Sequence, residues 1–248
     1  MIKYISDSFK KAVCSKGTLW YLIGTLGIII LANIAVISFR FIYGTNEGTF
    51  SYNVFEYASW CFLLPYYSCI LIAYIAAGRE DPDARGLKPW QVYVSKLAAS
   101  LMLAAVFLVA AFILLYAVTS LFHINEGAIL PGVVRSFLSK AALSLPLWFA
   151  GISFAVMFLL IFDEKWKTFA GFVFLTVIIP QFIRILSLDK FDIAFFRLIR
   201  RYTITQSFGL VPYPSYPDRS VPLIITLGIV YGIAASLVGI AVYQKKAK

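Results

Sequence analysis

Two long apolar stretches on either side of one polar segment constrain this chain more than any other feature. Stretches 54–77 and 97–122 are each long enough to cross a bilayer as a helix, which takes about 20 apolar residues. The segment between them, 78–96, reads GREDPDARGLKPWQVYVSK and holds six charged side chains within ten positions. We therefore expect two membrane helices joined by a polar turn that is exposed on one face of the membrane.

The composition agrees with a membrane domain. Of the 248 residues, 61% are hydrophobic and only 14% are charged, whereas about 25% charged residues are typical of soluble domains. The net charge of +10 would suggest nucleic acid as a partner of a soluble protein. In a membrane protein, Lys and Arg instead flank the spans and meet anionic lipid headgroups. We expect one domain over 1–248, with membrane lipid and not nucleic acid as its surroundings.

Six apolar stretches occur along the chain, at 18–43, 54–77, 97–122, 139–162, 168–188 and 222–243. They predict an all-α membrane protein with six transmembrane helices. Ahead of the first stretch, segment 1–17 predicts an amphipathic helix on the membrane surface, since its apolar residues recur at steps of three and four. Those residues are Ile2, Ile5, Phe9 and Val13. A frayed basic tail is the alternative for this segment.

The distribution of basic residues predicts the orientation. With six spans both termini share one side, and that side would carry 13 of the 22 Lys and Arg residues. Basic residues favour the cytoplasmic side, so we expect a multi-pass protein of the cell membrane with both termini in the cytoplasm. Most of the remaining basic residues surround segment 189–220.

Segment 189–220 is too short and too charged to be a further span. Apolar residues recur there at helical spacing from Phe191 to Tyr202, and the basic residues fall mostly on another face. We expect an outer amphipathic helix, re-entering or lying in the interface between spans five and six. Its candidate functional residues are Phe191, Phe195, Arg197, Leu198, Arg200, Arg201 and Tyr202.

The polar segment 78–96 carries a resemblance to permease subunits of the ABC-2 type. The matching positions are Glu80, Gly86, Leu87, Lys88, Tyr93, Ser95, Lys96 and Leu97. Residues 81–85 are more charged than the family pattern, and a Ser–Arg pair is missing near Trp90 and Gln91. The layout of the chain is also similar to that family, with a short loop at 163–167 and outer helices after span five. Chains of this size resemble permeases for antimicrobial-peptide or lantibiotic immunity and for peptide export.

The resemblance implies that 78–96 carries a coupling helix, the element that sits on a separate ATPase subunit. The residues that it assigns to this contact are Glu80, Arg85, Leu87, Lys88 and Trp90, with Asp163, Glu164 and Lys165 in the second loop. From charge and spacing alone, an ordinary solvated hairpin loop is the favoured interpretation of 78–96. Trp90 is also readable as an anchor at the membrane interface.

The chemistry that the sequence lacks narrows the function. The pattern G-x-x-x-x-G-K-[ST] does not occur, so ATP and Mg would bind a partner subunit and this chain needs no cofactor of its own. A single histidine, His123, excludes H-E-x-x-H and multi-histidine metal sites, and the three cysteines are expected to be free. Glu56 is expected at the outer edge of its span, outside the membrane interior. We therefore expect a non-enzyme without a metal site.

Three functions remain. The first is an ABC transporter subunit that exports an amphipathic or hydrophobic substrate and works with two ATPase subunits and a second permease, identical or sister. The second is a membrane enzyme, for which no constellation of catalytic residues can be assembled. The third is a non-transporting membrane assembly or sensor protein. Co-purification with an ATPase would separate the first from the others.

Overall fold

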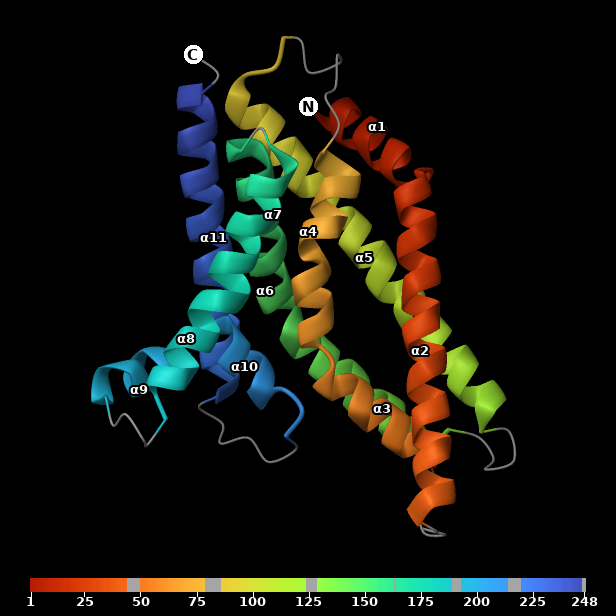
Figure 1. Ribbon diagram of the computed structural model, residues 1–248. Coiled ribbons are helices and arrows are strands. Elements are labelled where there is room, and N and C mark those ends of the chain that lie inside the picture. The colour runs from red at the N-terminus through yellow and green to blue at the C-terminus, as the bar shows by residue number, and fades with distance from the viewer. Residues whose placement is uncertain are drawn as a thin grey trace.

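The computed structural model describes residues 1–43, 50–78, 86–123, 129–162, 164–188, 193–213 and 220–246. Within these ranges the regular structure is entirely helical. Figure 1 shows a bundle of long helices with both termini at one end and the short helices α9 and α10 at the other. The expected all-helical class is confirmed, and so is the placement of both termini on one side of the bundle.

Among the residues that the structure describes, five helical stretches are long and apolar enough to cross a membrane. They are α2 (Lys16–Tyr43), α5 (Pro89–Phe122), α6 (Pro131–Ile161), the composite stretch Lys165–Leu186 and α11 (Ser220–Lys246). The composite stretch joins α7 (Lys165–Val173), the π-helix η3 (Phe174–Ile178) and α8 (Ile179–Leu186). The π-helix lies just before Pro180, whose ring would clash with the carbonyl four residues earlier in a regular helix. The chain is thus a multi-pass membrane protein.

The apolar stretch 54–77 does not form the single helix that its composition predicted. It forms α3 (Phe50–Trp60) and α4 (Leu63–Ala77), which meet at an angle of 62°. The cause is Pro65, which has no amide hydrogen and excludes the carbonyl of Cys61 from a regular helical turn. A tighter bond replaces it, from the Leu64 amide to the Cys61 carbonyl at 2.9 Å. The polar loop expected over 44–53 is also shorter, because α3 begins at Phe50.

Two long helices begin eight residues before the apolar stretches that predicted them. α5 begins at Pro89 instead of residue 97, and α6 begins at Pro131 instead of residue 139. Proline suits the first helical position because its fixed φ fits the helix and its missing N–H would have no partner there. The short helix expected at the end of 78–96 is therefore the first two turns of α5.

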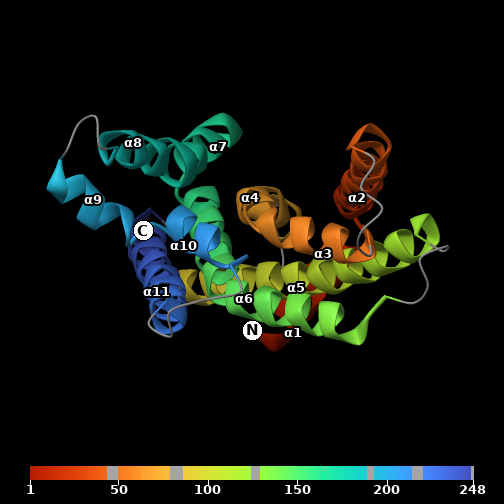
Figure 2. The ribbon, with the colours of Figure 1, turned by 90° about the horizontal axis from the view of Figure 1, so that it is seen from below.

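The core of the bundle is α6, which packs against α11, α4 and α5. In Figure 2 α11 and α4 lie on either side of α6. Glycines allow the close approach of α11. A Cβ atom added at Gly228 would lie 2.4 Å from the carbonyl carbon of Pro146, and one added at Gly232 would lie 2.2 Å from the ring of Phe149. Small residues spaced four apart are a common means of packing membrane helices.

The peripheral helices leave large apolar side chains exposed, as a bilayer requires. On α2 the exposed fraction is 70% for Trp20 and 66% for Leu31, and on α8 it is 60% for Phe182. Figure 2 shows α2 and the composite span α7–α8 on the outside of the bundle, with α4 between them.

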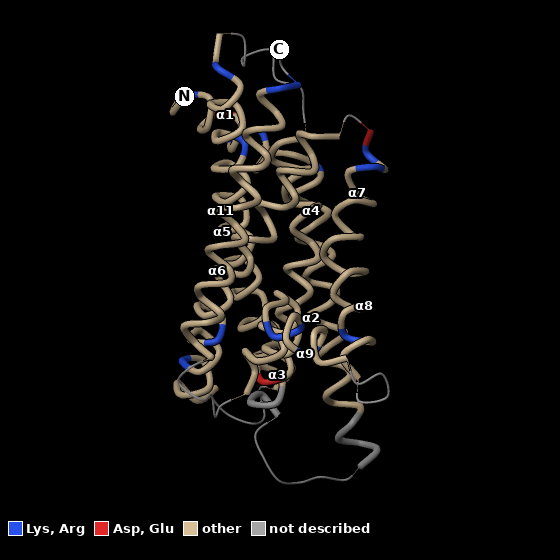
Figure 3. The backbone as a smooth tube through the Cα atoms, turned by 90° about the vertical axis from the view of Figure 1, so that its left-hand side faces the viewer, with Lys and Arg blue, Asp and Glu red and all other residues tan. Residues whose placement is uncertain are grey.

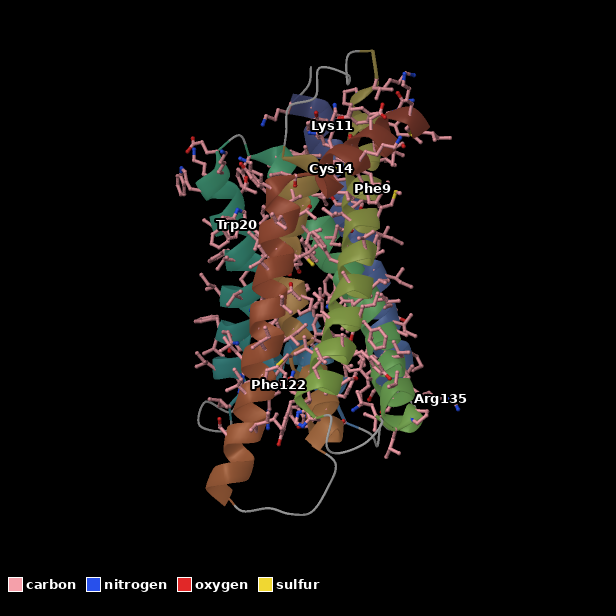
Figure 4. The ribbon with its side chains drawn as sticks, turned by 90° about the vertical axis from the view of Figure 1, so that its right-hand side faces the viewer. Phe9, Lys11, Cys14, Trp20, Phe122 and Arg135 are labelled. Carbon is pink, nitrogen blue, oxygen red and sulfur yellow. The ribbon has the colours of Figure 1, made fainter. Side chains whose placement is uncertain are left out.

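A 12-residue helix, α1 (Ile2–Val13), precedes the first span. It buries Tyr4, Ser8 and Ala12 and packs mainly on α5. The apolar face that the sequence predicted lies next to this buried face of α1. It is only partly covered, since Ile2 is 82% exposed. In Figure 4, where Phe9, Lys11 and Cys14 are labelled, α1 lies at the end of the bundle that carries both termini.

The outer segment forms two short helices where one was expected. These are α9 (Ala194–Arg200) and α10 (Ile204–Leu210). Thr203 separates them, because its hydroxyl accepts a hydrogen bond from the Gln206 amide and so starts a new helix. α10 is sunk into the bundle, with Phe208 and Val211 buried and the Phe208 ring 5.3 Å from that of Tyr66.

Candidate functional site

The charged side chains of the bundle lie mainly at its two ends. Figure 3 shows Lys and Arg gathered toward the two ends of the helices, with the stretch between them largely free of charge. We call the end that carries both termini the terminal end, and the end that carries α9 and α10 the opposite end. The predicted ATPase contact falls on the terminal end.

The first part of that contact is the junction of α4 and α5. Gly86 adopts a φ of +96°, a value that favours glycine, and turns the chain toward α5. The Lys88 amide donates to Oε1 of Gln91 at 2.9 Å and closes the first turn of α5. Nζ of Lys96 donates to the carbonyl of Ala77 at 2.9 Å, across the junction. A hydrogen bond therefore connects α4 directly to α5 beside the polar segment that joins them.

The second part is the start of α7, which follows the short loop after α6. Nζ of Lys165 lies 5.6 Å from the ring centroid of Tyr74 on α4, a cation–π contact. The carboxylate of Glu164 accepts hydrogen bonds from Lys167 and from the indole of Trp166. The two loops that the sequence assigned to one partner are thus linked through the end of α4.

The structure leaves the described residues of this contact available. Lys88, Glu164 and Lys165 are exposed, Trp90 is 40% exposed, and Leu87 is half-buried. Glu80, Arg85 and Asp163 lie outside the described residues. Both interpretations of Trp90 stay open, since its exposure suits an anchor in the interface as well as a protein contact.

At the opposite end, the predicted residues of the outer helix have two different roles. The exposed fraction is 64% for Phe195, 53% for Leu198 and 46% for Tyr202, as expected for a face against lipid. Arg201 is also exposed. Phe191 lies outside the described residues.

Arg200 and Arg197 both take part in interactions, unlike the residues of a basic face that contacts solvent alone. Nε of Arg200 donates to Oε1 of Gln206 at 3.1 Å, and its Nη1 donates to Oγ of Ser187 at 3.3 Å. Arg200 thereby fastens α9 to both α8 and α10. Arg197 is exposed and makes an interaction of its own. Arg200 therefore makes hydrogen bonds within the protein in addition to lying on the predicted basic face.

An ion pair that the sequence did not predict lies at the same end. Nζ of Lys140 is 2.7 Å from Oε2 of Glu56, and Lys140 is only 9% exposed. Glu56 is half-buried, and its carboxylate has a partner, which its expected place at the outer edge of the span did not predict. The reason is the early start of α6, which places Lys140 nine residues into the helix and opposite α3. A lone Glu and a lone Lys in two apolar stretches were the signal that pointed to this pair.

The described residues contain no set of three or more His, Cys, Asp or Glu side chains that could hold a metal ion. Cys14 and Cys61 are exposed and Cys69 is buried, and all three thiols are free. Several buried polar atoms have no partner, among them Oδ1 of Asn33 and Oγ of Ser153. What the described arrangement offers is charge contacts at its ends and apolar surface between them.

No family model, no curated protein and no solved structure matches this chain.

Proposed function

We propose that this chain is the membrane subunit of an ABC transporter of the ABC-2 type, and that a separate subunit hydrolyses the ATP. One observation carries the proposal above the others. The first turns of α5 and α7, which carry the exposed residues Lys88 and Lys165 at the terminal end, are both joined to the end of α4, one through the bond of Lys96 to Ala77 and the other through Lys165 over Tyr74. A partner that pushes on either of these turns therefore acts on α4, α5 and α7 together.

The proposal includes a six-span topology. We take α3 and α4 as one span broken at Cys61, which adds to the five continuous stretches. An even number of spans agrees with the two termini at one end of the bundle. The excess of basic residues at that end favours its placement on the cytoplasmic side of the cell membrane. α1 then lies along the cytoplasmic interface, and α9 and α10 lie on the outside.

The mechanical part of the proposal rests on continuity of structure. α5 begins directly after the polar segment and runs for 34 residues, about 51 Å at the helical rise, without an internal proline. Packed helices shift as units, so a small displacement of its first turn reaches the other end of the bundle. ATP-driven closure of the partner would supply that displacement.

The cargo that suits this chain is amphipathic or hydrophobic, such as a peptide, an antimicrobial compound or a lipid-like molecule. The described membrane surface consists of aliphatic and aromatic side chains, including Tyr57, Trp60 and Leu71 on α3 and α4. A pathway between subunits would need a second permease, identical or sister, and two ATPase subunits.

Purification of the tagged chain in mild detergent tests the proposal. We expect an ATPase with a phosphate-binding loop to be recovered at near-equal stoichiometry, and ATP hydrolysis to fall to background when that subunit is removed. Reconstituted in vesicles, the assembly should move an amphipathic cargo in an ATP-dependent way. Hydrolysis by the chain alone, or an assembly without any ATPase, would contradict the proposal and favour a non-transporting membrane protein.

A further inference from the structure

The bend between α3 and α4 has the construction of a pivot. The carbonyl of Phe62 accepts a hydrogen bond from the indole Nε1 of Trp148 at 3.0 Å, which fixes the bend to α6. Regular helical bonding is interrupted at Cys61 because of Pro65. A helix interrupted in this way can change its direction with little loss of backbone hydrogen bonding. The segment beyond the pivot, α3, forms a short arm that packs on α6, α2 and α5.

Aromatic rings pack the pivot and the arm against neighbouring segments. The ring of Phe137 on α6 meets Phe55 and Phe62 edge-on, at centroid distances of 5.4 Å and 5.2 Å. Next to the pivot, the ring of Trp60 meets that of Tyr213 at a centroid distance of 5.2 Å. Edge-on aromatic pairs of this kind stabilise packing beyond the apolar area that they bury.

One charged contact joins the arm to α6 more specifically. Glu56 lies on the arm, and its carboxylate meets the buried ammonium of Lys140 at 2.7 Å. The same two residues line a small hollow with Phe55, Val133, Ser136 and Phe137. Because the charges lie at the edge of the membrane region, separating them requires either water or a new partner for each.

We propose that α3 is a hinged gate at the opposite end of the bundle, and that the Glu56–Lys140 pair is the ionic latch that holds it against α6. The latch closes the arm in the resting state, and its release swings α3 about Phe62. The role of this motion in transport rests on the proposed function, whereas the latch itself does not.

Thiol labelling tests the latch in the purified full-length chain. Ser59 lies on α3 and is 1% exposed, so a Ser59→Cys reporter is protected while the arm is packed. The background carries Cys14→Ser, Cys61→Ser and Cys69→Ala, and the probe is a membrane-impermeant maleimide. Labelling should be slow in this chain, because it needs the open arm and its rate follows the open fraction.

The decisive variant replaces both charges by amides, Glu56→Gln with Lys140→Gln. It leaves no unpaired charge behind, so a misfolded core is not its expected result. If the pair is a latch, labelling of the reporter accelerates by at least about tenfold, a change of about 1.4 kcal/mol in the closed state. Arg135→Gln is the matched control, since Arg135 lies on the same helix, is exposed and points away from the bundle in Figure 4. It should leave the rate unchanged.

Two outcomes overturn the latch. One is a double-amide variant that labels as slowly as the parent chain. The other is a charge swap, Glu56→Lys with Lys140→Glu, that labels as fast as the double-amide variant, because an ionic latch should re-form in reverse. Labelling in the ATPase-bound complex, with and without ATP, then tests whether transport uses the gate. A latch present in the chain alone but insensitive to ATP in the complex would count against the transport role only.

Discussion

The close packing of α11 on α6 determines how much the substitution Gly228→Ala should destabilise the protein. In Gly228→Ala the new methyl group would lie 2.4 Å from the carbonyl carbon of Pro146. Ordinary contact between carbon atoms begins near 3.5 Å, so the helices must separate by about 1 Å. Pro146 presents backbone atoms at this point, and backbone cannot swing aside as a side chain can.

Overpacking a well-packed core costs about 1–3 kcal/mol, and a backbone obstacle places this variant at the upper end, about 3 kcal/mol. Replacing a helical glycine by alanine returns about 1 kcal/mol through helix propensity. The expected net loss in unfolding free energy is about 2 kcal/mol. For a chain of this size that lowers Tm by about 4–8 °C.

Thermal unfolding in detergent measures the effect, with Gly24→Ala as the matched control. Gly24 lies in α2 and has no atom within 4 Å of its added Cβ, so its variant should be as stable as the parent chain or slightly more stable. If Gly228→Ala unfolds at the same temperature as Gly24→Ala, the close contact of α6 with α11 is not what holds this bundle together.

Two further predictions concern the opposite end. Arg200→Gln removes the bonds to Gln206 and Ser187 and should speed proteolysis near α9 several-fold, whereas Arg201→Gln, at an exposed neighbour, should not; equal proteolysis would show that Arg200 fastens nothing. For topology, native Cys14 and a Tyr213→Cys variant, both exposed, should react with an impermeant thiol reagent from opposite sides of the membrane. Reaction of both from one side would contradict the six-span arrangement.

Local composition predicted most of the fold, because a bilayer imposes a simple rule on length and polarity. Every apolar stretch in the sequence became helical. The ends were less predictable. Pro89 and Pro131 start their helices inside polar sequence, where a hydropathy argument stops. Proline favours the first helical position, and this preference applied to Pro89 and Pro131 extends both predicted helices to their observed starts.

Features that depend on two distant segments were beyond local reasoning. Pro65 marked a disturbance in the second stretch, but the 62° bend also depends on the bond from Trp148 to Phe62. The pairing of Glu56 with Lys140 joins residues 84 positions apart, and it requires that α3 lie against α6. The two segments of the predicted ATPase contact were each found locally, but their common connection to the end of α4 depends on how that helix packs.

Coupled ATP hydrolysis by the proposed complex with an ATPase measures whether the terminal-end segments receive that subunit. The variants are Lys88→Glu and Lys165→Glu, with Lys245→Glu as a control that is exposed in the same terminal region. Reversing a charge at an exposed contact changes the interaction by about 1–2 kcal/mol, a factor of about 5–30 in affinity. We predict that the first two variants lose complex recovery and stimulated hydrolysis by about that factor, with normal membrane insertion and an unaffected control. If all three behave like the parent chain, the loops at the terminal end do not receive an ATPase, and the account of this chain as a transporter subunit is contradicted.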